Sequence, residues 1–142
     1  MKSLEYGISF VRNLEHLRYK TGVICGYPQS GKSTYASELA RTAPLLFVDV
    51  LAEILPNLPE PLGAYDHASL IRYIENTDKN NVLGTILDDV EPLLATFGKE
   101  RARAFFLAFS RVEARKPIIV VTHLDKMLEA TFTRDRVLYL TT

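Results

Sequence analysis

A short stretch near the start of the chain has the residue types and spacing of a phosphate-binding loop. Residues 26–33 read Gly-Tyr-Pro-Gln-Ser-Gly-Lys-Ser, a full match to the pattern G-x-x-x-x-G-K-[ST]. The two glycines allow backbone geometry that side chains would block. The loop can then turn its N–H groups toward phosphate oxygens, at the positive end of the helix that follows. The residues expected to contact the phosphates are Gly26, Tyr27, Pro28, Gln29, Ser30, Gly31, Lys32, Ser33 and Thr34.

Three side chains of this loop have separate expected roles. Lys32 can reach the β- and γ-phosphates of a nucleotide as a point charge, and the Ser33 hydroxyl is placed to bind Mg²⁺. Thr34 is expected to contact the α-phosphate. The guanine-recognition pattern N-K-x-D does not occur, since residues 122–126 read Thr-His-Leu-Asp-Lys. ATP and Mg²⁺ are therefore the predicted ligands.

Acidic residues that could accompany the metal follow about 55 positions later, in the stretch TILDDVE (85–91). Asp88 comes at the end of an apolar run and is predicted to hold Mg²⁺ through its water. Asp89 or Glu91 could orient or deprotonate an attacking water. The alternative is that residues 87–92 are only a polar strand end and helix start, but their spacing from the loop favours the metal site.

A third apolar run, IIVVTHLD (118–125), also ends in polar side chains. The hydroxyl of Thr122 or the imidazole of His123 could hydrogen-bond an anionic γ-phosphate oxygen. A lone histidine is more often structural, so both interpretations of His123 remain open. His16 and His67 have no partner at a telling spacing and are expected to be surface or packing residues.

The elements that would position these residues follow from the hydrophobic pattern. Helices are predicted over 4–18, 31–42, 66–76 and 98–115, and strands over 21–26, 44–50, 81–91, 116–125 and 135–142. Three prolines make residues 55–63 a loop. Alternating strands and helices indicate an α/β fold with a parallel sheet covered on both faces.

Bulk composition limits the protein class. The 142 residues, 47% hydrophobic and 24% charged, predict a single globular domain over 1–142, with residues 1–20 a helix packed on its core. The net charge of zero argues against a dominant electrostatic grip on nucleic acid. Cys25, the one cysteine, is expected to be a buried thiol. The sequence has neither an apolar span of membrane length nor a signal-peptide core, so a cytoplasmic location is expected.

Five stretches together resemble the RecA-like core of P-loop ATPases, including archaeal RadA and KaiC-type proteins. They read GYPQSGKSTYASELA, LLFVDV, TILDD, IIVVTH and TRDRVLYL. The resemblance implies a three-layer sandwich around a mostly parallel five-stranded sheet, with one strand between the loop strand and the acid-bearing strand. It also implies hydrolysis of ATP to ADP and phosphate in DNA recombination or repair. The implied partners are single-stranded DNA, a recombinase-type protein, or further copies of the chain sharing an ATP site.

Two departures from that pattern matter. RecA-like proteins usually carry a glutamate two residues after an aspartate like Asp49, but Leu51 stands there and Glu53 comes two residues later. Catalysis would then use Glu53, Asp89 or Glu91, or be weak. The segment between residues 125 and 135 is also too short for a recombinase DNA-binding loop, which favours a minimal paralogue.

Arginines could extend the site to a neighbouring molecule. Residues 100–115 carry Arg101, Arg103, Arg111 and Arg115 beside an aromatic stripe, and a solvated face is the favoured interpretation. Arg134 and Arg136 occupy positions where RecA-like proteins can place subunit contacts.

Two other functions remain as alternatives. A small-molecule or nucleotide kinase, transferring the γ-phosphate of ATP, would need an arginine lid, but residues 98–105 read as continuous helix. An AAA+-type loader or regulator would suit LDDVE, although its helical lid domain would lie outside these 142 residues.

Overall fold

A five-stranded parallel sheet forms the middle of the protein. The computed structural model describes residues 2–57, 65–80, 83–123 and 125–140. The strands are β1 (Thr21–Gly26), β2 (Leu46–Asp49), β3 (Thr85–Asp88), β4 (Ile118–His123) and β5 (Val137–Tyr139), in the order β2-β3-β4-β1-β5. Every pairing is parallel. The predicted α/β fold is thus confirmed, and β4 does lie between the loop strand β1 and the acid-bearing strand β3.

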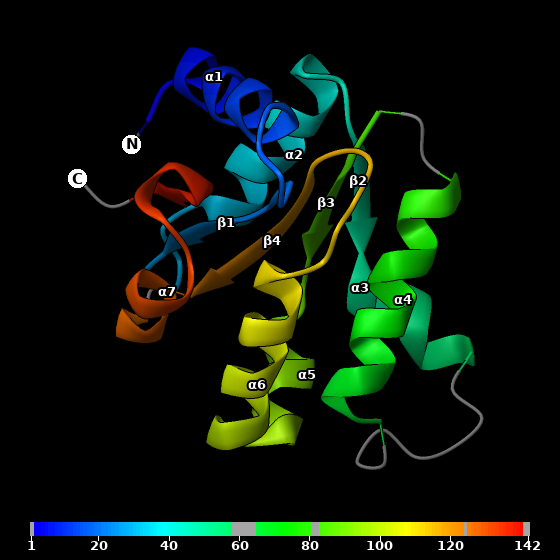
Figure 1. The fold of residues 1–142 in the computed structure, drawn as a ribbon. Coiled ribbons are helices and arrows are strands. Elements are labelled where there is room, and N and C mark those ends of the chain that lie inside the picture. The colour runs from blue at the N-terminus through cyan, green and yellow to red at the C-terminus, as the bar shows by residue number, and fades with distance from the viewer. Residues whose placement is uncertain (1, 58–64, 81–82, 124, 141–142) are drawn as a thin grey trace.

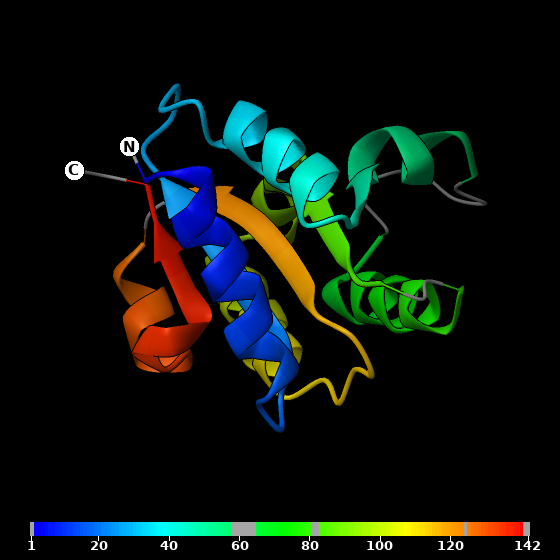
Figure 2. The same cartoon turned by 90° about the horizontal axis from the view of Figure 1, so that it is seen from above.

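Helices cover both faces of this sheet, which gives three layers (Figures 1 and 2). They are α1 (Leu4–Glu15), α2 (Lys32–Thr42), α3 (Val50–Ile54), α4 (His67–Asn80), α5 (Glu91–Phe97), α6 (Lys99–Ser110) and α7 (Lys126–Thr131). Figure 1 shows α1 and α2 on one side of the sheet and α4, α5 and α6 on the other. Three layers of this kind bury the strands on both faces, as the apolar runs of β1 and β4 require.

Alternate residues of the central strands point to opposite faces of the sheet. Val23 and Val120 belong to the core beneath α4, α5 and α6, whereas Ile24 and Val121 belong to the core beneath α1 and α2. This is the period of two that a strand imposes on its side chains. Helix α1 is fixed to α2 by burial of its apolar stripe and by the Tyr35 hydroxyl, which donates to the Ser3 carbonyl at 2.7 Å.

Two short helices, α3 and α5, were missed; all but their first residues lie in segments 51–54 and 92–97, for which no element was predicted. Strand β2 ends at Asp49, where the side chain accepts a hydrogen bond from Ala52 N at 3.1 Å and so starts α3. Strand β3 ends at Asp88, and α5 begins at Glu91 with Pro92 in its first turn. Gly98, at φ 82°, separates α5 from α6.

Other boundaries also differ from the prediction. Helix α6 ends at Ser110 rather than at residue 115, and β5 spans only Val137–Tyr139 after a 3₁₀ turn over Arg134–Arg136. A second 3₁₀ turn covers Leu55–Asn57, while the remainder of the predicted loop, 58–63, lies outside the described residues. Within the described residues, no helix is long and apolar enough to cross a membrane.

Arg136 is a buried structural residue and not a subunit contact. Its guanidinium group donates to the Thr21 carbonyl oxygen at 2.8 Å, to Thr21 Oγ1 at 2.6 Å and to the Ser110 carbonyl oxygen at 2.7 Å. Thr21 begins β1, so these bonds lie at the end of the sheet opposite the loop. Burial lowers the pKa of Arg136. The expectation of a subunit contact therefore stands only for Arg134, which is exposed.

The arginines around α6 match the favoured interpretation of a solvated face. Arg101 and Arg103 are exposed, while Phe105 and Phe109 on the same helix are buried. Arg115 lies beyond the end of the helix, and its guanidinium group pairs with Asp78 at 3.5 Å.

Candidate phosphate-binding site

The loop over residues 26–31 stands at the carboxyl end of the sheet, between β1 and α2. Strand β1 ends at Gly26, which is in register with His123 at the end of β4. Helix α2 begins at Lys32. Ligands of open parallel sheets bind outside the carboxyl ends of the strands, so the loop is placed where such a sheet forms its sites.

The backbone of the loop needs its glycines. Gly31 has a φ of 81°, which favours glycine, and Gln29 is also left-handed at 62°. A Cβ atom at Gly26 would lie 2.7 Å from Ser30 Oγ, closer than real Cβ contacts. Ser30 N donates to the Tyr27 carbonyl at 3.1 Å, which closes the loop as a tight turn. The spacing of glycines in the sequence is thus explained by local geometry.

The polar groups around the loop suit an anion. Ser30 Oγ is buried and has no hydrogen-bond partner among the described residues. No side chain caps the start of α2, and its first turn holds no acidic residue. The N–H groups of that turn and the half-buried Lys32 therefore form a set of donors with no carboxylate among them. These features fit the phosphates of a nucleotide.

The predicted acid lies next to the loop. Ser33 Oγ donates to Asp88 Oδ1 at 3.2 Å, which joins the start of α2 to the end of β3. The structure thereby brings together the two residues predicted to hold Mg²⁺. No group of three or more His, Cys, Asp and Glu side chains in the described part of the chain could hold a metal by itself. A Mg²⁺ ion at Ser33 and Asp88 would therefore need phosphate oxygens as further ligands.

Asp89 stands in a cluster of carboxylates that sequence reasoning recognised only in part. Asp49 and Asp88 are register partners at the ends of β2 and β3, and Asp89 follows with a left-handed φ of 64°. Partial burial raises the pKa of Asp89, and the charge of Asp49 and a hydrogen bond with its carboxyl group raise it further. Asp49 was missed as a neighbour of the site, although its place at a strand end was the available signal.

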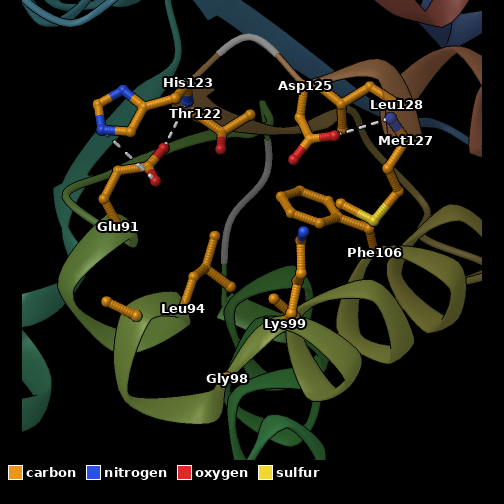
Figure 3. Close-up of a pocket in the computed structure, with 12 residues that line it drawn as sticks. Glu91, Leu94, Gly98, Lys99, Phe106, Thr122, His123, Asp125, Met127 and Leu128 are labelled. Carbon is orange, nitrogen blue, oxygen red and sulfur yellow. Dashed lines mark hydrogen bonds and ion pairs between the residues drawn. The ribbon is translucent and has the colours of Figure 1, made fainter.

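Glu91 binds the end of β4. Its Oε1 accepts a hydrogen bond from His123 N at 2.5 Å, and its Oε2 lies 3.7 Å from His123 Nε2 (Figure 3). Thr122 is buried beside them, and His123 Nδ1 has no partner among the described residues. Of the predicted catalytic residues, Glu91, Thr122 and His123 thus form one group at the ends of α5 and β4.

Glu53 lies elsewhere. It is exposed on α3, and its charge contributes, after burial, to a raised pKa of Tyr73 on α4. The structure therefore places Glu53 beside α4. The half-buried Leu51, two residues earlier, packs against the core.

Sequence reasoning also missed a cavity next to this group. About 340 Å³ of space opens at the carboxyl end of β4, between α5, α6 and α7. Thr122 and His123 contribute to its lining, together with Lys99 and Asp125, which no motif had singled out. Only the tertiary packing of the three helices brings these residues together.

Comparison with known proteins supports the fold. No family model matches the chain, and no curated protein does. Among solved structures, PCH-2 of C. elegans superposes with a TM-score of 0.55 at 15% sequence identity. The match covers 98% of this chain and 42% of PCH-2, so the chain spans less than half the length of that neighbour. What the two structures share is the fold, a three-layer α/β sandwich around a parallel sheet.

Proposed function

We propose that the chain binds Mg²⁺–ATP at residues 26–34 and acts as a RecA-like ATPase. The observation that carries the proposal is the hydrogen bond of 3.2 Å between Ser33 and Asp88. A hydroxyl at the start of the loop helix and a carboxylate at the end of a neighbouring strand are the pair that P-loop enzymes use around their metal. The sandwich shared with PCH-2 supports the fold that this proposal requires.

Each residue of the site would have a separate role in binding or hydrolysing ATP. Lys32 and the N–H groups of the loop would bind the phosphates and neutralise charge that develops on the γ-phosphate. Ser33 and Asp88 would hold Mg²⁺, which supplies further charge neutralisation when bound. Asp89 lies beside Asp88 and would position the attacking water, with Glu91 as the second candidate for that role. Thr122 and His123 would contact the γ-phosphate from the end of β4.

Turnover should be slow under this proposal. Leu51 stands where RecA-like proteins usually carry a glutamate, and Glu53, the predicted substitute two residues later, lies near Tyr73 of α4. Glu91 is already engaged by His123. The RadA- and KaiC-type resemblance extends the proposal to an accessory role in DNA recombination or repair, with single-stranded DNA or a recombinase-type protein as partner.

Phosphate release from Mg²⁺–ATP, with and without single-stranded DNA, tests both parts. Lys32→Ala should abolish binding and turnover while the fold persists. Lys116→Ala, an exposed lysine at the opposite end of the sheet, is the matched control and should leave both unchanged. Unchanged turnover in Lys32→Ala would refute the assignment of the loop. Turnover that DNA does not alter would refute only the role in recombination or repair.

The cavity beside Thr122 favours one second candidate, a small-molecule kinase. An acceptor bound there would lie next to the end of β4, where the γ-phosphate is expected. Transfer of labelled γ-phosphate from ATP to a small acceptor, rather than to water, would establish this alternative. Release of free phosphate without transfer to an acceptor would support the ATPase and exclude the kinase.

A further inference from the structure

The cavity at the carboxyl end of β4 is separate from the phosphate loop. Its volume of about 340 Å³ is within the range of small-molecule sites. Its lining includes none of residues 26–34, all of which the structure describes. A ligand could therefore occupy it without occupying the loop.

One part of the cavity wall is apolar. Leu94 of α5, Phe106 of α6 and Leu128 of α7 are buried, and the half-buried Met127 lies beside Phe106 (Figure 3). Methionine and aromatic side chains adapt to ligands of different shape. This wall can receive an apolar group of moderate size.

The same end of the cavity holds two opposite charges. Figure 3 shows the Lys99 ammonium group and the Asp125 carboxylate pointing toward one another, close to Phe106 and Met127. Asp125 Oδ1 accepts a hydrogen bond from Met127 N at 2.9 Å, which leaves Oδ2 without a partner among the described residues. Within that part of the chain, no hydrogen bond or ion pair engages the ammonium group of Lys99.

The remaining charges of the cavity are already used. Glu91 is bound to the backbone and ring of His123 at the other end. A ligand that enters would therefore meet the Lys99 ammonium group and the Asp125 carboxylate next to an apolar wall. Both residues are exposed, so water solvates the two charges in the free protein, and a simple anion or cation would contact only one of them.

We propose that this cavity binds a free α-amino acid with a large apolar side chain. Such a molecule carries an ammonium group and a carboxylate on the same carbon atom, so its two charges can face Asp125 and Lys99 together. Its side chain would lie against Phe106, Met127 and Leu94. This inference does not depend on nucleotide binding.

Calorimetric titration with L-phenylalanine and two truncated analogues tests the proposal. Phenethylamine lacks the carboxylate, and 3-phenylpropionate lacks the ammonium group. L-Phenylalanine should bind the unaltered protein about tenfold more tightly than either analogue, as expected for loss of one charged hydrogen bond. Equal affinity for all three compounds, or no heat with any of them at millimolar concentration, would overturn the proposal.

Two variants that each remove one charge from the cavity locate the two contacts. In Lys99→Met, L-phenylalanine should bind no better than phenethylamine, and in Asp125→Asn it should bind no better than 3-phenylpropionate. Asparagine retains the cap of α7, so the fold should persist. Lys126→Met, an exposed neighbour outside the cavity lining, should behave like the unaltered protein. If Lys99→Met and Lys126→Met bind alike, the assignment of Lys99 is wrong.

Two further measurements separate the cavity from the loop. Ala102→Leu adds bulk inside the lining and should abolish the binding of L-phenylalanine. Lys32→Ala should leave that binding intact, even if it removes all binding of ATP. Loss of L-phenylalanine binding in Lys32→Ala would place the amino acid at the loop and refute the proposal.

Discussion

Replacement of Arg136 by methionine should destabilise the protein strongly. The guanidinium group donates three hydrogen bonds, to the carbonyl and hydroxyl oxygens of Thr21 and to the carbonyl of Ser110. Thr21 is 0% exposed and Ser110 5%, so water cannot readily replace the lost donor. Methionine would also lose the contact of the guanidinium group with Phe132, whose ring centre lies 5.0 Å from the guanidinium carbon.

The magnitude follows from the hydrogen bonds. A hydrogen bond to a charged group contributes about 1.5–3 kcal/mol, and an acceptor left buried without a donor costs about 1–3 kcal/mol. Relief from burying the charged guanidinium offsets part of this loss. We expect Arg136→Met to lower the free energy of unfolding by about 3–5 kcal/mol, and Arg136→Lys by about half of that, because one ammonium group cannot reach Thr21 and Ser110 together.

Urea denaturation followed by far-ultraviolet circular dichroism measures the change, since the chain has no tryptophan. The midpoint should fall with little change in the slope m. Arg134→Met, the exposed arginine of the same turn, is the control and should alter the free energy of unfolding by less than about 0.5 kcal/mol. A loss below about 1 kcal/mol in Arg136→Met would refute the view that this residue holds β1 to α6.

Three further predictions concern the loop, the thiol and the acidic cluster. Gly26→Ala should weaken ATP binding at least tenfold in a titration. The new Cβ atom would lie 2.7 Å from Ser30 Oγ and would push that side chain out of place. Burial raises the pKa of Cys25 to about 12, so iodoacetamide at pH 8 should label the folded protein far more slowly than the protein in urea. Because the pKa of Asp89 is raised in the folded state, its ionisation opposes folding: the cost begins above the ordinary pKa of an aspartate and is complete above the folded pKa. Asp89→Asn should therefore raise the free energy of unfolding at pH 7, and the gain should disappear below about pH 4, where the carboxyl group is protonated in both states.

Each of these has a contrary result. Unchanged ATP affinity in Gly26→Ala would mean that Ser30 moves without consequence for the loop. Rapid labelling of Cys25 in the folded protein would mean that its thiol is accessible to solvent. A loss of stability in Asp89→Asn at pH 7 would show that its carboxylate is favourably held.

Prediction from sequence succeeded where local spacing decides the structure. The glycine spacing of residues 26–31 follows from a turn with left-handed backbone, and the strand-loop-helix order follows from it. The parallel direction of the strands follows from their alternation with helices. The neighbourhood of Ser33 and Asp88 was predicted because the carboxyl ends of parallel strands meet at one edge.

Prediction failed where side chains distant in sequence decide the outcome. Helices α3 and α5 have only 5 and 7 residues, too few for a clear period; Asp49 caps the start of α3, and Pro92 lies in the first turn of α5. A charged residue such as Arg136 is expected at the surface from sequence alone. Its acceptors are Ser110, which lies 26 positions earlier in the chain, and Thr21, which lies 115 positions earlier. Lys99 and Asp125 belong to no motif, and only packing places them in one cavity.

The strand order has a consequence for synthesis of the chain. Strand β1 carries the phosphate loop, yet its two neighbours are made after β2 and β3, since Val23 pairs with Val120 and with Val137. During translation, at about 5–20 residues per second, β1 would wait several seconds for either partner. The nascent loop therefore cannot acquire its shape from the sheet until β4 and β5 have been made. Until then, an apolar strand with two unpaired edges is exposed, and chaperones or the ribosome surface would have to protect it from aggregation.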